Sequence, residues 1–178
     1  MIHTYIPYAP KEKDQNLGWA YNNFMEIIGD DDWVCFLDHD AMFTTKHWYH
    51  QLTDVVNKYP DIGVFSCMTN RIGNYPQKLQ GINDNNHDIK YHRLIGKELY
   101  DTCYDEIVTE HLHHLISGVI ILISKKTWNT VGGFKDGFLG VDNDIHRKCI
   151  NHNIPVGIMS GVYTYHWYRG DGDVSHLK

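Results

Sequence analysis

Two aspartates, Asp38 and Asp40, follow directly on five apolar or aromatic residues, Trp33 to Leu37. This pattern is typical of a strand that is buried on both faces and ends at the edge of a sheet. On an extended strand the two carboxylates project to the same side, roughly 6–7 Å apart. There they can share one hard divalent cation, or one can hold the cation while the other binds a sugar hydroxyl. A strand that simply ends in a polar turn is the alternative interpretation, and the pair alone does not exclude it.

Acids and histidines also gather farther along the chain. Asp142 and Asp144 open a segment with helical spacing, so Asp142 is either a helix-capping acid or a group available for proton transfer. His166 ends the last apolar strand. His111 and His113 share a face if extended, but no second ligand pair with zinc-finger spacing accompanies them. We therefore expect no zinc site there.

Alternating strands and helices must position these residues. Runs of β-branched and aromatic residues predict strands over 2–8, 33–37, 62–67 and 117–123, and a last strand pair over 155–159 and 162–166. Apolar residues at helical spacing predict helices over 17–28, from Thr44 or Thr45 to Tyr59, over 91–104 and 125–131, and after Asp142. The stretch 68–90 has little periodicity and is predicted to be a long functional loop. This order of elements is typical of an α/β sheet.

The composition limits the class of protein. With 178 residues, 42% of them hydrophobic, the chain fits one globular domain. The net charge of −6 gives no indication of a nucleic-acid-binding surface. The four cysteines form no C-x-x-C pair, and no apolar run approaches the ~18 residues that span a bilayer. We expect a protein without a transmembrane segment, located in the cytoplasm.

The motifs occur in an order that is itself informative. They are an opening strand ending in Pro7-Tyr8, a helix start at Asn16-Leu-Gly18, the pair Asp38 and Asp40, Ser117-Gly118 on a buried strand, Gly132-Gly-Phe134, the helix tipped by Asp142, and His166. Over nearly the whole chain this order resembles the family 2 glycosyltransferases of GT-A fold. The resemblance implies a single GT-A-like, Rossmann-like domain over residues 1–178. Its central sheet would be mostly parallel, with helices on both faces.

The resemblance also implies an activity. A sugar would pass from a nucleotide-sugar donor, expected to be a UDP-sugar, to a hydroxyl of a carbohydrate or other acceptor, with inversion at the anomeric carbon. By their positions in the motifs, Asp38 would bind the ribose and lie near the metal, Asp40 and His166 would bind the metal, and Asp142 would be the base. Asp144 and Gly118 would contact the acceptor.

Carboxylate and imidazole ligands together favour Mn²⁺, with Mg²⁺ as the alternative. Such a cation bridges the two phosphates of a sugar nucleotide and stabilises the leaving diphosphate. Arg169, three residues after His166, can add a second positive contact to the donor. Its alternative role is that of a surface arginine.

The chain departs from the family pattern at two places. Val141 stands where the family usually has a Glu before the base, and only a few residues join Tyr8 to Asn16, where the family has two further strands. The nucleobase pocket would then lack the strands after the first, and Pro7 and Tyr8 would make the remaining contacts. We expect weak discrimination between bases unless the loop 70–86 or a second subunit of a homo-oligomer completes the pocket.

Two other functions remain open at this stage. The shortened donor half and Val141 favour a module that binds sugar or nucleotide without transferring it. A phosphatase of the haloacid-dehalogenase type also begins with an apolar strand into D-x-D. It usually has that motif near its N-terminus, followed by Thr or Val where this chain has Met42.

Overall fold

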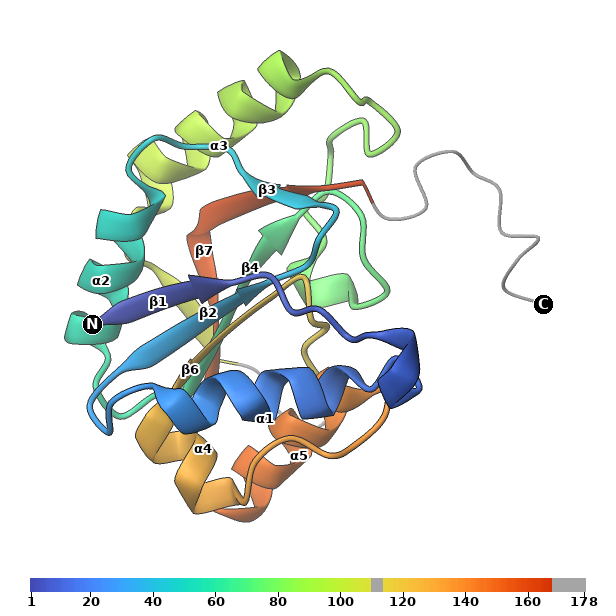
Figure 1. Ribbon diagram of the computed structural model, residues 1–178. Helices are drawn as coiled ribbons and strands as arrows, with labels where there is room; N and C mark the ends of the chain where they lie inside the picture. Colours follow the sequence, from blue (N-terminus) through green and yellow to red (C-terminus); the bar gives the residue numbers. More distant parts are fainter. Residues whose placement is uncertain (110–113, 168–178) are drawn as a thin grey trace.

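The computed structural model describes residues 1–109 and 114–167. The strands are β1 (Ile2–Tyr5), β2 (Trp33–Leu37), β3 (Ala41–Phe43), β4 (Val64–Thr69), β5 (Ile107–Thr109), β6 (Ile120–Ser124) and β7 (Val156–His166). The helices are η1 (Lys11–Lys13), α1 (Leu17–Ile27), α2 (Trp48–Lys58), η2 (Tyr75–Gln77), α3 (Ile89–Cys103), α4 (Lys125–Val131) and α5 (Val141–Asn151). The strands form one seven-stranded sheet in the order β1-β2-β6-β4-β7-β3, with β5 also paired to β7 (Figure 1). The α/β class predicted from the sequence is confirmed.

The sheet is mixed, so the prediction of a mostly parallel sheet was wrong. Among the strand pairs of the described residues, β1 with β2 and β4 with β7 are parallel. Strand β6 runs antiparallel between β2 and β4, and both β3 and β5 pair antiparallel with β7. A continuous apolar run indicates that both faces of a strand are buried. It does not indicate whether the strand pairs parallel or antiparallel with its neighbours.

Helices cover both faces of the sheet, as expected, and each face has its own core. Along β2, Val34 and Phe36 point to the layer of α1, α4 and α5, whereas Cys35 and Leu37 point to the layer of α2. Figure 1 shows these two helical layers, with α1, α4 and α5 below the sheet. All four of these side chains are buried because successive residues of a strand face opposite sides.

Several elements differ from their predicted bounds. Strand β3 was not predicted because it has three residues, and all three are only half-buried. Helix α2 begins at Trp48 instead of Thr44 or Thr45, since the Thr44 hydroxyl donates to the carbonyl of Tyr163 and caps no helix. Strand β7 is a single strand with a register shift against β4, where two strands were expected.

Helix α3 packs on β7 and on the segment after β3, with one glycine at each contact. A Cβ at Gly96 would collide with the Thr44 hydroxyl, and one at Gly161 would collide with the carbonyl of Cys103. Gly96 therefore allows close packing, although a glycine inside a helix is unfavourable by itself. The contact places α3 directly over the segment that follows β3.

The segment from Thr69 to Asp88 contains no long element, as predicted, but buried amides hold it in place. The Gln77 side chain donates to the Ser66 hydroxyl at 2.6 Å and accepts from the amide of Ser117 at 2.7 Å. Asn70 is fully buried. These bonds tie the loop to β4 and to the segment before β6, so that it lies along the sheet edge where Asp38 and Asp40 stand.

The segment between the first strand and the first long helix is as short as the sequence indicated. Strand β1 ends at Tyr5, three residues earlier than predicted, and only η1 separates it from α1. The Asn16 side chain caps α1 by accepting from the amide of Trp19 at 2.8 Å. All four cysteines are free thiols. Within residues 1–109 and 114–167, no helix combines the length and apolar character needed to cross a membrane.

Candidate metal centre

Asp38, Asp40 and His166 meet at one end of the sheet. Nε2 of His166 lies 3.2 Å from Oδ1 of Asp40 and 3.7 Å from Oδ2 of Asp38. One ligand atom from each of the three residues lies within 4.8 Å of the other two. The chain reverses after β2, and Ala41 then pairs with His166 across β3 and β7. The two acids and the histidine, far apart in the sequence, thus form one cluster.

The two aspartates lie in a turn, whereas the sequence predicted an extended strand end. Strand β2 stops at Leu37, and the amide of Ala41 donates to the carbonyl of Asp38 at 3.1 Å. The amide of Asp38 donates to Val119, and the carbonyl of Asp40 accepts from Trp167. The turn is thereby fixed to the residue before β6 on one side and to the residue after β7 on the other.

The ring of His166 is oriented by a hydrogen bond to the backbone. Its Nδ1 lies 2.8 Å from the carbonyl of Arg71, and a carbonyl oxygen only accepts, so Nδ1 carries the proton. In the neutral ring Nε2 then has a lone pair, and this atom faces the two carboxylates. An imidazole held in this way is the usual form of a metal-binding histidine. In the charged ring, the second proton lies on Nε2 and bonds to Asp40, and a cation among the three residues would take the place of that proton.

Asn70 fixes the backbone of His166. Its side-chain oxygen accepts from the His166 amide at 2.8 Å, and its side-chain nitrogen donates to the His166 carbonyl at 3.1 Å. Asn70 and Arg71 were not predicted as residues of this cluster. They follow β4 at the sheet edge where Asp38 follows β2, so the strand-end argument that selected the aspartates also applies to them.

The electrostatics distinguish the two aspartates. Burial raises the pKa of Asp38 to about 6, in spite of the opposing charge of His166, and the charge of Asp40 adds to the rise. Burial also acts on Asp40, but the hydrogen bond and charge of His166 outweigh it and lower the pKa of Asp40. A second positive charge at this position would stabilise both ionised carboxylates.

Asp142 lies in the first turn of α5, next to Gly118. Helix α5 begins at Val141 after Gly140, so Asp142 is not the N-cap residue. Its carboxylate accepts from the amide of Asn143 at 2.8 Å and from that of Gly118. Burial raises the pKa of Asp142, and these amides offset part of the rise. The negative charge of Asp142 contributes to the raised pKa of Asp38, so the two acids share one electrostatic environment.

Tyr21 on α1 belongs to the same environment. Its side chain is buried, and burial together with the charges of Asp38 and Asp142 raises its pKa far above the usual range. In the sequence, Tyr21 is one of the residues at helical spacing within the helix predicted over 17–28. No local pattern indicates its nearness to the two acids.

The remaining predicted site residues that the structure describes do not belong to the cluster of Asp38, Asp40 and His166. Asp144 forms an ion pair with Lys148 one turn along α5, at 3.1 Å. Pro7 and Tyr8 lie between β1 and η1, and Tyr8 is 72% exposed. Arg169 lies outside the described residues, as do His111 and His113.

Comparisons of the sequence with protein-family models and with curated proteins gave no match. The likeness to family 2 glycosyltransferases therefore rests on the motifs of this chain and on their order. What the structure adds is the cluster of Asp38, Asp40 and His166, with Asp142 close to the first of them.

Proposed function

We propose that the protein is a metal-dependent, inverting glycosyltransferase of GT-A type that uses a nucleotide-sugar donor. The observation that supports the proposal best is the meeting of Asp38, Asp40 and His166 at one sheet edge. A strand-end D-x-D pair alone has a simple structural explanation. A buried histidine whose ring is turned toward both acids by the Arg71 carbonyl does not follow from a polar turn.

The ligand set fits Mn²⁺, and Mg²⁺ as the alternative. Two carboxylates supply hard oxygen atoms, and the imidazole moves the preference toward a transition metal. When bound, the cation would neutralise the charge of the donor diphosphate and of the leaving group. Asp38 and Asp40, in the turn between β2 and β3, and His166, at the end of β7, would hold it.

Asp142 is the proposed general base. Its raised pKa increases its affinity for a proton, while the amides of Asn143 and Gly118 fix the direction of the carboxylate. Through this amide, Gly118 would orient Asp142. Val141, where the resembling family has a Glu, is buried in the core under the sheet, so it offers nothing to an acceptor.

A sugar- or nucleotide-binding module without transferase activity is the second candidate, and one observation favours it. Only η1 lies between β1 and α1, so the two strands that the resembling family has in this segment are absent from the described residues. A donor would contact the end of β1 and the exposed Tyr8, with little enclosure of its base.

Incubation with radiolabelled UDP-sugars, a mixture of hydroxyl acceptors and Mn²⁺ tests the proposal. Transfer or hydrolysis that is lost on chelation and in Asp40→Asn supports a transferase. Metal-dependent UDP binding without any turnover supports the binding module. Release of phosphate from simple phosphoesters, with no sugar transfer, would contradict both and indicate the phosphatase.

A further inference from the structure

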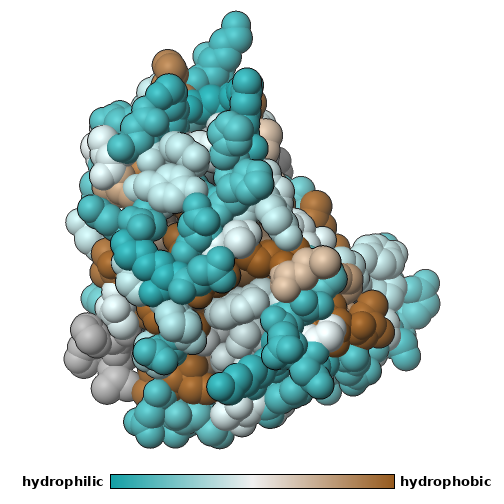
Figure 2. All heavy atoms as spheres, turned by 90° about the vertical axis from the view of Figure 1, so that its left-hand side faces the viewer, coloured by the Kyte–Doolittle hydropathy of each residue, from teal (hydrophilic) through white to brown (hydrophobic). Residues whose placement is uncertain are grey.

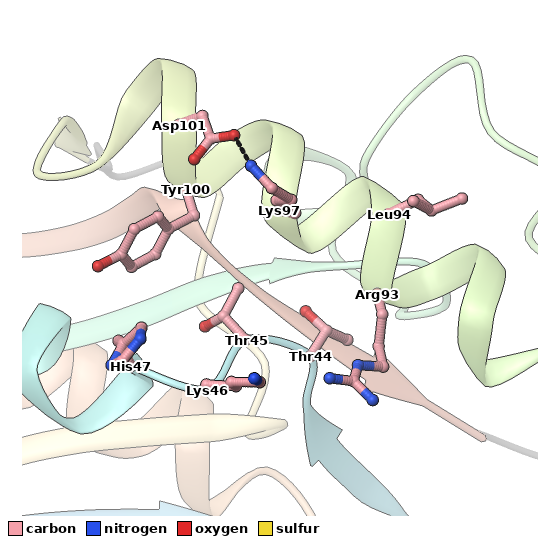
Figure 3. Close-up of a pocket in the computed structure, with 9 residues that line it drawn as sticks. All are labelled: Thr44, Thr45, Lys46, His47, Arg93, Leu94, Lys97, Tyr100 and Asp101. Carbon is pink, nitrogen blue, oxygen red and sulfur yellow. Dashed lines mark hydrogen bonds and ion pairs between the residues drawn. The ribbon is translucent and has the colours of Figure 1, made fainter.

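A cavity of about 450 Å³ lies between α3 and the segment that joins β3 to α2. Figure 3 shows Arg93, Lys97, Tyr100 and Asp101 on α3 above it, and Lys46 below. Residues 93, 97 and 100 are four and three positions apart, which places them on one face of the helix. The volume lies in the range of small-molecule sites, about 300–1,000 Å³.

The charge of this cavity is opposite to that of the chain. Three cationic side chains line it, and Asp101 is the acid among the lining residues. Lys97 pairs with Asp101. Across the described ranges, Lys46 and Arg93 make no hydrogen bond or ion pair, and Figure 3 shows their charged ends directed toward each other. The chain has more acidic than basic residues, with a net charge of −6, yet these two cations have no acidic partner among the residues that the structure describes. Two like charges at one cavity favour an anion between them.

The floor of the cavity is rigid. Thr44 is buried, and its hydroxyl donates to the carbonyl of Tyr163 at 2.7 Å. Gly96 packs α3 directly on Thr44. Figure 2 shows this face of the molecule, on which hydrophilic side chains predominate and apolar ones are scattered among them. The spacing between Arg93 and the segment that carries Lys46 is therefore set by the fold.

We infer that this cavity binds the phosphate group of a small organic phosphate. The forked guanidinium of Arg93 matches phosphate geometry, and Lys46 adds a point charge from the opposite wall. Leu94 and the ring of Tyr100 contact the organic part. The site is separate from the aspartate–histidine cluster, because the strand β3 holds Asp40 and Thr44 about 13 Å apart. The inference does not rest on the proposed transferase activity.

Calorimetric titration of the metal-free protein, kept in chelator, with glucose 6-phosphate tests the inference. We expect saturable binding that is about tenfold weaker or more in Arg93→Gln and in Lys46→Gln, since each removes a charged hydrogen-bond donor. Asp101→Asn should bind several-fold more tightly because it releases Lys97. Lys126→Gln, an exposed lysine on α4, and Asp40→Asn should match the wild type.

Three outcomes would overturn the inference. They are no saturable binding, equal affinity in wild type and Arg93→Gln, and binding of glucose as tight as that of glucose 6-phosphate. A parallel arm uses vesicles that contain phosphatidic acid. Arg93-dependent binding to these vesicles without binding of glucose 6-phosphate would overturn the small-molecule assignment in favour of a lipid phosphate. Circular dichroism of each variant establishes that the fold is retained.

Discussion

The Nε2 atom of His166 lies 3.2 Å from Oδ1 of Asp40 because the residue after this aspartate, Ala41, is paired with His166 between β3 and β7. The antiparallel pairing thus sets the distance between the acid turn and the end of the last strand. Any change that moves β3 relative to β7 also moves the proposed metal ligands.

Mn²⁺ should bind to the wild-type protein and bind much more weakly when one ligand is removed. We expect Asp40→Ala and His166→Ala each to weaken Mn²⁺ affinity by at least tenfold, as measured by calorimetry. His39→Ala is the matched control, since His39 lies between the two aspartates but outside the cluster. Unchanged affinity in His166→Ala would remove this histidine from the ligand set.

Asp142→Asn should separate folding from transfer. Asparagine keeps an oxygen that accepts from the Asn143 amide, so stability and nucleotide binding should be retained. Without a base at this position, transfer should fall by about 10²–10⁴-fold. The turnover of a labelled nucleotide sugar is the measurement. Asp144→Asn serves as control, and the assignment of the base fails if this control loses as much activity as Asp142→Asn.

The protein should bind different nucleoside diphosphates with similar affinity. Strand β1 ends at Tyr5, and Tyr8 is largely exposed, so most of the binding energy should come from the diphosphate and the ribose. An aromatic ring adds only about 1–3 kcal/mol by stacking and does not discriminate strongly between bases. We expect UDP, GDP and CDP to bind within about tenfold of one another, a spread of ~1.4 kcal/mol, and only with metal. A preference above a hundredfold would require another part of the chain or a second subunit in the pocket.

Because His146 is buried, the protein should lose stability in mild acid. Its Nδ1 accepts from the Ile116 amide at 3.0 Å, and burial lowers its pKa to about 4. Between the unfolded value of about 6.5 and this folded value, the unfolded chain binds a proton that the folded protein excludes. The stability that His146 contributes is complete above pH 6.5 and is lost as the pH falls toward 4.

Urea unfolding of metal-free protein at pH 7.5 and at pH 5 measures this effect. In His146→Asn the side-chain oxygen replaces Nδ1 as acceptor but does not titrate. The loss of unfolding free energy between the two pH values should be smaller than in the wild type by about 2 kcal/mol. His152→Asn, an exposed histidine of the same region, is the control. Equal losses in wild type and His146→Asn would show that this ring does not resist protonation.

Features that depend on near neighbours in the chain were predictable from the sequence. The apolar run before Asp38 became β2, and the helix start at Asn16 became the capped start of α1. Capping and burial on both faces act within a few residues, so their patterns can be seen in one short segment. The proximity of Asp38, Asp40 and His166 was also expected, but from the order of the motifs and not from local physics.

The direction of the strands and the surroundings of each site residue were decided only by the tertiary structure. Strand β6 is as apolar as a parallel strand would be, yet it runs antiparallel between β2 and β4. The bond between His166 and the Arg71 carbonyl joins segments with no local relation, and so does the cavity that Arg93 and Lys46 line. Such contacts form when side chains from distant segments are packed against one sheet, and the energy of that packing depends on pairs that no single stretch of sequence contains.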